Sequence, residues 1–300
     1  MTQSARRVMP EEQELKPMED PLEQVVKPEI LSGWRAALRD LAQMLRFYSR
    51  LPVPKLPIEQ DAHVLPDFKI APRMVAIAGA IIGIPTAIIL WLAVSLGLPT
   101  LLAAGLAVAI SIIATGAFHE DGLADTFDGL AGGATKERRL DIMKDSRIGA
   151  FGGSALVLGI ILRIVALAGL LEEVEASSTA FIVIAAASLS RSLGLAPLAF
   201  LPNARPGGFS SSVGRPDMPA FVMTIMLSVA LAGATSQIVG LSLFSMAGAI
   251  CLAILPVALV SWWALKTIEG QTGDIAGAAQ QLSEIAFYTG LLMAISLTHG

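Results

Sequence analysis

Residues Val75–Leu96 read VAIAGAIIGIPTAIILWLAVSL and contain no charged side chain. A helix of about 20 such residues is long enough to cross the hydrocarbon core of a bilayer. Further apolar runs follow along the chain, at Leu101–Phe118, Phe151–Leu171, Thr179–Phe200, Phe221–Ser236, Leu241–Leu265 and Ile285–Thr298. The pattern predicts an all-α protein, a polytopic integral membrane bundle of about seven transmembrane helices.

The composition supports a membrane protein and argues against other classes. Of the 300 residues, 54% are hydrophobic and 15% are charged, whereas a soluble domain usually carries about 25% charged residues. The net charge of −4 argues against a nucleic-acid-binding protein. The single cysteine, Cys251, excludes an intramolecular disulfide and is interpreted as a small packing residue.

The N-terminal part of the chain differs from the rest. Residues 1–30 are acidic, rich in proline and free of aromatic side chains, which predicts a disordered tail. This tail has no apolar segment of the kind found in a signal peptide. Residues 31–300 are expected to form one membrane-embedded domain. It begins with an amphipathic helix within Gly33–Pro54, which is expected to lie on the membrane surface or against the bundle.

The basic residues predict the orientation of the chain. Arg50, Lys55, Lys69 and Arg73 precede the first apolar run, so the positive-inside rule places the N-terminus in the cytoplasm. Alternating spans then bring three polar, glycine-rich segments to the cytoplasmic face. These segments are His119–Gly149, Pro202–Asp217 and Glu269–Gln281. Together they predict one composite site at that face.

The first polar segment opens with HEDGLADTFDG, residues His119–Gly129. Asp121, Asp125 and Asp128 stand at i, i+4 and i+7, so a helix places them on one face. Like charges on one helix face repel one another, and hard oxygen ligands suit Mg²⁺. With Glu120 adjacent, the motif predicts a Mg²⁺–diphosphate site. The alternative is a solvated acidic helix end.

Basic and polar side chains supply candidate partners for the phosphate groups. Lys144 and Arg147 are candidates to hold phosphate oxygens, or else determinants of topology alone. Arg163 and Arg191 lie within apolar runs, where a charge is costly and indicates function or a buried ion pair. In the third segment, Asp274 and Glu284 are candidates for a second metal contact or for ribose hydroxyls. Gln280 and Gln281 are candidates for the recognition of amides. His119 is a candidate base or an orienting hydrogen bonder.

These segments together resemble the cobalamin synthase family, the adenosylcobinamide-GDP ribazoletransferases. The matching pieces are Phe47–Pro54 (FYSRLPVP), His119–Gly129, Glu137–Gly152 (ERRLDIMKDSRIGAFG) and Gly273–Ala278 (GDIAGA). The resemblance implies an inner-membrane enzyme of late cobalamin biosynthesis, with a transferase domain over residues 31–300. Such an enzyme condenses adenosylcobinamide-GDP with α-ribazole or its 5′-phosphate, releases GMP and gives adenosylcobalamin or its phosphate.

The resemblance also implies roles for the candidate residues. Metal ligands for Mg²⁺ are expected to be Glu120, Asp121, Asp125 and Asp128. Asp128 or His119 is expected to take the proton from the attacking hydroxyl, and phosphate oxygens are expected to contact Lys144, Arg147, Arg191 and Arg205. Asp274 and Gln280 are expected to bind substrate. The expected partners are the two substrates and membrane lipid, with no nucleic acid; a homo-oligomer or other corrinoid-pathway enzymes stay open.

Two other functions compete with this interpretation. A CDP-alcohol phosphotransferase also carries several aspartates on membrane helices, but its pattern has an Ala-Arg pair and a second aspartate pair that are missing here. A secondary transporter places ionisable groups near the middle of the bilayer on several helices. In this chain most of the ionisable groups cluster at one face, which favours an enzyme.

Overall fold

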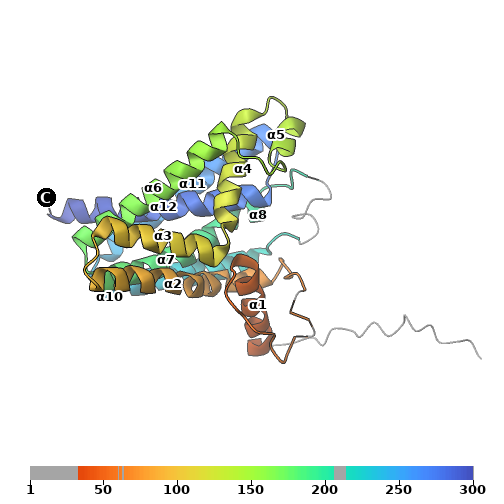
Figure 1. The fold of residues 1–300 in the computed structure, drawn as a ribbon. Coiled ribbons are helices and arrows are strands. Elements are labelled where there is room, and N and C mark those ends of the chain that lie inside the picture. Colours follow the sequence, from red (N-terminus) through yellow and green to blue (C-terminus); the bar gives the residue numbers. More distant parts are fainter. Residues whose placement is uncertain (1–32, 60, 63, 206–213, 300) are drawn as a thin grey trace, which may run out of the picture. The chain divides into compact units, whose positions relative to one another are not determined.

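The computed structural model describes residues 33–59, 61–62, 64–205 and 214–299. The tail predicted for residues 1–30 lies outside the described residues. Within the described part every regular element is helical, so the all-α prediction is confirmed (Figure 1). The predicted amphipathic helix is α1 (Gly33–Tyr48), which buries Met44 and Leu45 and leaves Trp34 exposed.

Five helices or helix pairs of the described chain are long and apolar enough to cross a membrane. They are η1 (Ala71–Met74) with α2 (Val75–Ser95), α6 (Ala150–Glu173), α7 (Ala176–Gly194) with α8 (Ala196–Phe200), α10 (Met218–Val239), and α11 (Leu243–Ile268). Their outer surfaces expose large apolar side chains, among them Trp91, Leu158, Met226 and Trp262. A water-facing surface rarely carries so much apolar area, and the chain is a multi-pass membrane protein.

A sharp bend changes the predicted count of seven spans. Helix α3 (Thr100–Thr115) ends at Gly116 and Ala117, which both have left-handed backbone angles (φ 65° and 58°). Helix α4 (Phe118–Gly132) then leaves at 90° to α3, so the pair is one further candidate span at most, and the described chain has five or six. The acidic motif therefore lies on a separate helix rather than on a continuation of the second span.

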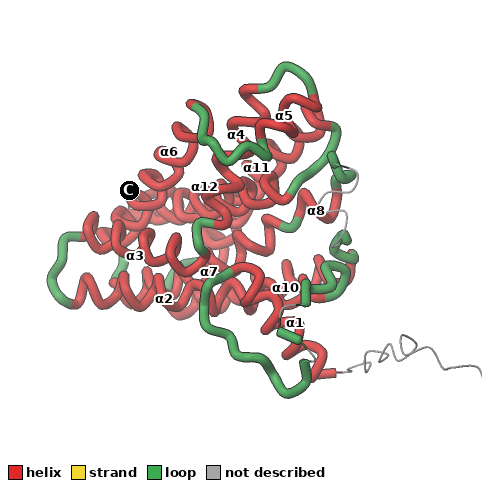
Figure 2. Tube along the Cα trace, turned by 45° about the vertical axis from the view of Figure 1, so that its right-hand side comes forward, coloured by secondary structure: helices red, strands yellow, loops and turns green. Residues whose placement is uncertain are grey.

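The last helix, α12 (Gly273–His299), contains the predicted run Ile285–Thr298 but is not among the candidate spans. Its first half carries Asp274, Gln280, Gln281 and Glu284, and the last three are buried. Helix α12 packs against α4, α6, α7 and α11, and Figure 2 shows it inside the group of helices. Its polar side chains therefore face other helices instead of lipid.

The three polar segments of the sequence meet at one end of the bundle, here called the polar face. Lys136 of α5 (Lys136–Ile142) forms an ion pair with Glu269 at 2.7 Å. Arg139 donates to the carbonyl of Thr267 at 3.1 Å, and Arg205 donates to the carbonyl of Leu140 at 2.7 Å. The predicted clustering of these segments is confirmed for the described residues (Figure 1).

We expect a reporter that is active only in the periplasm to be inactive when fused after Gly133 or Gly273. The same reporter should be active when fused after Glu175, which lies in the α6–α7 connection at the opposite end of the bundle. The reason is that, among the described residues, the connections that carry Lys or Arg lie at the polar face, which the positive-inside rule places in the cytoplasm. Reporter activity in the fusion after Gly133 would indicate that the protein has the opposite orientation in the membrane.

Candidate functional site

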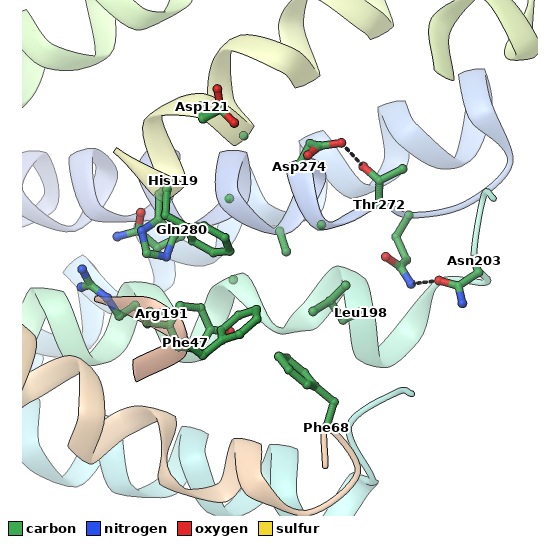
Figure 3. Close-up of a pocket in the computed structure, with 18 of the residues that line it drawn as sticks. Phe47, Phe68, His119, Asp121, Arg191, Leu198, Asn203, Thr272, Asp274 and Gln280 are labelled. Carbon is green, nitrogen blue, oxygen red and sulfur yellow. Dashed lines mark hydrogen bonds between the residues drawn. The ribbon is translucent and has the colours of Figure 1, made fainter. Parts of the chain in front are cut away.

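A cavity of about 280 Å³ opens at the polar face, between α1, α4, α7, α8 and α12. Figure 3 shows carboxylates on one side of this pocket and aromatic rings on the other. The polar residues that line it are His119, Asp121, Arg191, Asn203, Arg205, Gln271, Thr272, Asp274 and Gln280. Its aromatic lining consists of Phe47, Tyr48, Phe68 and Phe118.

A close crossing of two helices brings the two pocket carboxylates together. Gly122 of α4 meets Gly277 of α12 so closely that an added Cβ at Gly122 would lie 3.2 Å from the Gly277 Cα. Glycine permits this approach because it has no side chain. Asp121 and Asp274 flank the crossing and face the same cavity. Asp274 also accepts a hydrogen bond from Thr272 at 3.0 Å.

The segment after α8 supplies a cation and two amides. Gln271 donates its backbone N–H to the carbonyl of Pro202 at 2.8 Å, and its carbonyl accepts from the N–H of Ala204 at 3.0 Å. The two side-chain amides of Asn203 and Gln271 are also hydrogen bonded (Figure 3). This pairing fixes Arg205 in the pocket wall, where it is an electrostatic neighbour of Asp274.

Three buried polar side chains line the pocket on α4, α7 and α12. His119 stacks on Tyr48 with ring centroids 5.7 Å apart, and its Nε2 atom has no hydrogen-bond partner within the described chain. Arg191 donates to the carbonyl of Ala187 at 3.0 Å, while its Nε atom is without a partner among the described residues. Gln280 donates to Ser190 at 2.9 Å. His119 and Arg191 thus retain unused hydrogen-bonding capacity.

The other two aspartates of the motif do not line this pocket. Asp128 is buried and accepts hydrogen bonds from the backbone N–H groups of Gly149 and Gly152 at 2.7 and 2.8 Å. It thereby caps the N-terminus of α6, where backbone N–H groups otherwise lack partners. Asp125 is half-buried beside it, one turn from Asp121. Their predicted metal roles stay predictions.

Glu120 points away from the pocket into the bundle. It forms an ion pair with Arg163 at 2.8 Å and accepts a hydrogen bond from Gln281 at 3.2 Å. Both charged side chains are almost completely buried. The charge of Arg163 within an apolar helix is therefore explained by a partner on α4, while the role of Glu120 as a metal ligand stays a prediction.

Lys144 and Arg147 lie in the exposed connection between α5 and α6 and do not line the pocket. The Nε–H of Arg147 donates a bifurcated hydrogen bond to the two carboxylate oxygens of Asp145, at 2.9 and 3.1 Å. This side-chain bond, together with a backbone bond and the charge of Arg147, lowers the pKa of Asp145 to about 2. The phosphate contacts predicted for Lys144 and Arg147 stay predictions.

The carboxylates fit Mg²⁺ only as a shared site. No group of three His, Cys, Asp or Glu side chains close enough to hold a metal occurs within the described residues. Mg²⁺ is usually bound by one or two carboxylates together with phosphate oxygens and water, rather than by a cage of protein ligands. Asp121 and Asp274, from two helices facing one cavity, match that donor set.

A comparison with known protein families shows to which family this chain belongs. The model of the family described as cobalamin-5-phosphate synthase matches residues 40–292. The chain belongs to this family. The matched region of the cobalamin-5-phosphate synthase family includes every residue that lines the pocket. No solved structure matched the chain.

The chain aligns with curated relatives over nearly the whole length of each relative. The adenosylcobinamide-GDP ribazoletransferase of Azorhizobium caulinodans is 48% identical over 266 residues, which are 85% of this chain and 96% of that protein. The enzyme of the same name from Xanthobacter autotrophicus is 42% identical over 85% of this chain and 96% of its own length. The enzyme of the same name from Allorhizobium ampelinum is 38% identical over 87% of this chain and 98% of its own length.

The pocket unites six predicted site residues with others that the sequence did not single out. The predicted residues in its lining are His119, Asp121, Arg191, Arg205, Asp274 and Gln280. The aromatic lining was missed, although Phe47 and Tyr48 belong to the FYSRLPVP motif of the family resemblance. Aromatic residues at helical spacing in α1 also suit lipid contact, so their direction into the site needed the structure.

Proposed function

We propose that this chain is a transferase that joins adenosylcobinamide-GDP to α-ribazole, or to its 5′-phosphate, with release of GMP. The observation that carries the proposal is the meeting of Asp121, Asp274 and Arg205 in one pocket, in a member of the cobalamin-5-phosphate synthase family. Relatives that match over most of their length are named adenosylcobinamide-GDP ribazoletransferases. Carboxylates and a guanidinium are the groups that hold a metal-bound diphosphate.

The reaction requires a hydroxyl to attack phosphorus. A ribose hydroxyl of α-ribazole forms a new P–O bond to the cobinamide phosphate, while the P–O bond to GMP breaks and GMP leaves with the electron pair. His119 is the better-placed base for the hydroxyl proton, because it lines the pocket and its Nε2 atom has no hydrogen-bond partner among the described residues, whereas the Asp128 carboxylate accepts from two backbone N–H groups. Arg205 and Arg191 stabilise the phosphate oxygens.

Asp121 and Asp274 would hold Mg²⁺ against the diphosphate. The ion supplies neutralisation of the phosphate charge and orientation of the leaving group. The pocket also presents Arg205 near Asp274, so the diphosphate would contact both the ion and a guanidinium group. The enzyme is proposed to lie in the cell inner membrane with this pocket on the cytoplasmic side, in agreement with the basic connections of the polar face.

The deciding experiment measures GMP release by the purified full-length protein from adenosylcobinamide-GDP and α-ribazole. The proposal predicts equal amounts of GMP and of the joined corrinoid, with no GMP when α-ribazole is left out. Release of CMP from a CDP-alcohol would favour a phosphotransferase of the other class. Uptake of a substrate into vesicles without any GMP release would favour a transporter.

We expect Asp121→Asn and Asp274→Asn each to lower kcat/KM for adenosylcobinamide-GDP by about 100-fold or more, because each removes one charge from the shared metal site. Asparagine keeps the volume of the side chain, so membrane insertion and protein level should stay normal. Asp141→Asn is the matched control, because Asp141 lies exposed on α5 and does not line the pocket. Full activity in either pocket variant would remove that residue from the metal site.

A further inference from the structure

We infer that the aromatic side of the pocket is the binding site for the base of α-ribazole, and that the amphipathic helix α1 supplies its central ring. The inference rests on the proposed function and names the substrate that each side of the pocket takes. The phosphate-binding side consists of Asp121, Asp274 and Arg205. The aromatic side is defined by Phe47, Tyr48, Phe68, Phe118 and Leu198. Figure 3 shows Phe47, Phe68 and Leu198 across the cavity from Asp121 and Asp274.

The aromatic side is a continuous cluster of rings from three separate segments. The ring of Phe47 makes edge contacts with Tyr48, Phe68 and Phe118, at centroid distances of 4.9, 4.9 and 5.5 Å. Tyr48 in turn stacks on His119, with their ring planes 1° apart. Planar ligands are held well by such rings, through stacking and edge contacts. The cluster ends next to His119, the proposed base.

The cluster is held in place by a tether between α1 and the loop that follows it. Arg46, the neighbour of Phe47, forms two hydrogen bonds of 2.7 Å to the carboxylate of Glu59 and donates to the carbonyls of Val53 and Pro54. Burial raises the pKa of Glu59, but the hydrogen bonds from Arg46 and the Leu56 amide outweigh it and hold the pKa below its usual value. The carboxylate therefore stays charged and the tether stays closed at neutral pH.

A second tether joins the end of α1 to the bend that carries Phe118. The backbone N–H of Arg50 donates to the carbonyl of Ala114 at 2.7 Å. Ala114 lies in the last turn of α3, directly before the left-handed residues Gly116 and Ala117. Phe47 and Phe118 are thus fixed relative to each other by the backbone. A preformed pocket wall of this kind binds a ligand with less loss of entropy.

The chemistry of the wall selects between the bases of the two substrates. Guanine carries hydrogen-bond donors and acceptors on its edges, and burial of these groups without partners is costly. The side chains of Phe47, Phe68, Phe118 and Leu198 offer no such partners, and the Tyr48 hydroxyl is the one polar group among the side chains that define the aromatic side. A benzimidazole-type base has a largely hydrocarbon edge, so it loses few hydrogen bonds to water when it is buried there. The aromatic side therefore suits the ribazole base, and the ribose then extends toward His119 and the carboxylates.

The size of the cavity agrees with a nucleoside. Small-molecule sites are usually clefts of about 300–1,000 Å³, and this cavity of about 280 Å³ is at the lower limit. A nucleoside fits such a volume, whereas a corrinoid is much larger and must lie mostly outside it. The corrinoid substrate would then insert only its diphosphate end, toward Asp121 and Asp274.

The test compares steady-state KM values for the two substrates in full-length protein. Phe47→Leu should raise the KM for α-ribazole about tenfold, as expected for the loss of one stacking ring. The KM for adenosylcobinamide-GDP should change less than about twofold, and kcat less than about threefold, because the diphosphate contacts are untouched. Phe47→Tyr keeps the ring and should restore the KM for α-ribazole to near the unmodified value. Trp34→Leu, on the exposed part of α1, is the matched control and should change neither KM.

Equilibrium dialysis of α-ribazole against the protein, without the corrinoid substrate, separates this inference from the proposed function. Weaker α-ribazole binding by Phe47→Leu, with guanosine failing to compete in the unmodified protein, supports the inference even if no GMP is released. A raised KM for adenosylcobinamide-GDP alone, or unchanged KM values for both substrates, would overturn it. If Phe47→Leu assembles poorly, Phe118→Leu gives the same comparison, because Phe118 is 44% exposed and its truncation should leave little buried empty space.

Discussion

Excess EDTA should lower GMP release by the purified protein by at least about 100-fold, and Mg²⁺ added back in excess should restore the full rate. Asp121 and Asp274 face the same cavity that must admit a diphosphate. A divalent cation would offset the repulsion between these carboxylates and the diphosphate. The rate of GMP release, measured against the free Mg²⁺ concentration, checks the expectation directly.

Two controls distinguish loss of the reaction metal from loss of the fold. The melting temperature of the protein in detergent should be nearly the same with EDTA and with Mg²⁺, because the described residues form no closed metal cage. Asp121→Asn and Asp274→Asn should raise the Mg²⁺ concentration that gives half of their remaining activity. Unchanged GMP release in excess EDTA would contradict a metal role for both carboxylates.

Hydropathy alone predicted most of the helices, because apolar runs of this length have few other stable states in a bilayer. It could not predict the bend at Gly116 and Ala117, where the apolar character of the sequence continues through Phe118. The bend depends on two left-handed backbone conformations and on the contact between Arg50 and Ala114. Long-range contacts of this kind leave no periodic trace in a sequence.

The site was predicted where charge and spacing point to one chemistry, and less well where packing decides direction. Asp121 and Asp274 were both candidates, but their meeting depends on the crossing of Gly122 with Gly277. Asp128 shares a helix with Asp121, yet its carboxylate turns to the N-terminus of α6. The sequence shows which residues share a helix face, whereas the neighbouring helices determine what each side chain contacts.

The direction of Phe47 could also not be predicted from the sequence alone. A basic amphipathic helix next to a membrane domain is typical of a surface helix, and the exposed Trp34 of α1 agrees with that interpretation. The last turn of the same helix turns Phe47 and Tyr48 into the pocket. Both contacts belong to one short helix, so a pattern of apolar residues could not separate them.

Removal of either partner of the buried pair Glu120–Arg163 should destabilise the bundle strongly. Breaking one side of a buried ion pair typically costs about 3–5 kcal/mol, because it leaves an uncompensated charge. Arg163→Met leaves the Glu120 carboxylate with only the amide of Gln281, and Glu120→Gln leaves the Arg163 guanidinium unneutralised. We therefore expect each variant to lower the melting temperature in detergent by about 5–10 °C.

The double variant Glu120→Gln, Arg163→Met distinguishes a structural pair from a metal ligand. If the two charges serve each other, the double variant should be more stable than the sum of the single changes predicts, because no lone charge remains. Glu137→Gln on the exposed surface of α5 is the matched control and should leave the melting temperature unchanged. If Glu120 binds Mg²⁺ instead, Glu120→Gln should keep the melting temperature and raise the Mg²⁺ requirement of GMP release. That outcome would support Glu120 as a metal ligand. An unchanged melting temperature of Arg163→Met would show that the ion pair does not hold α4 against α6.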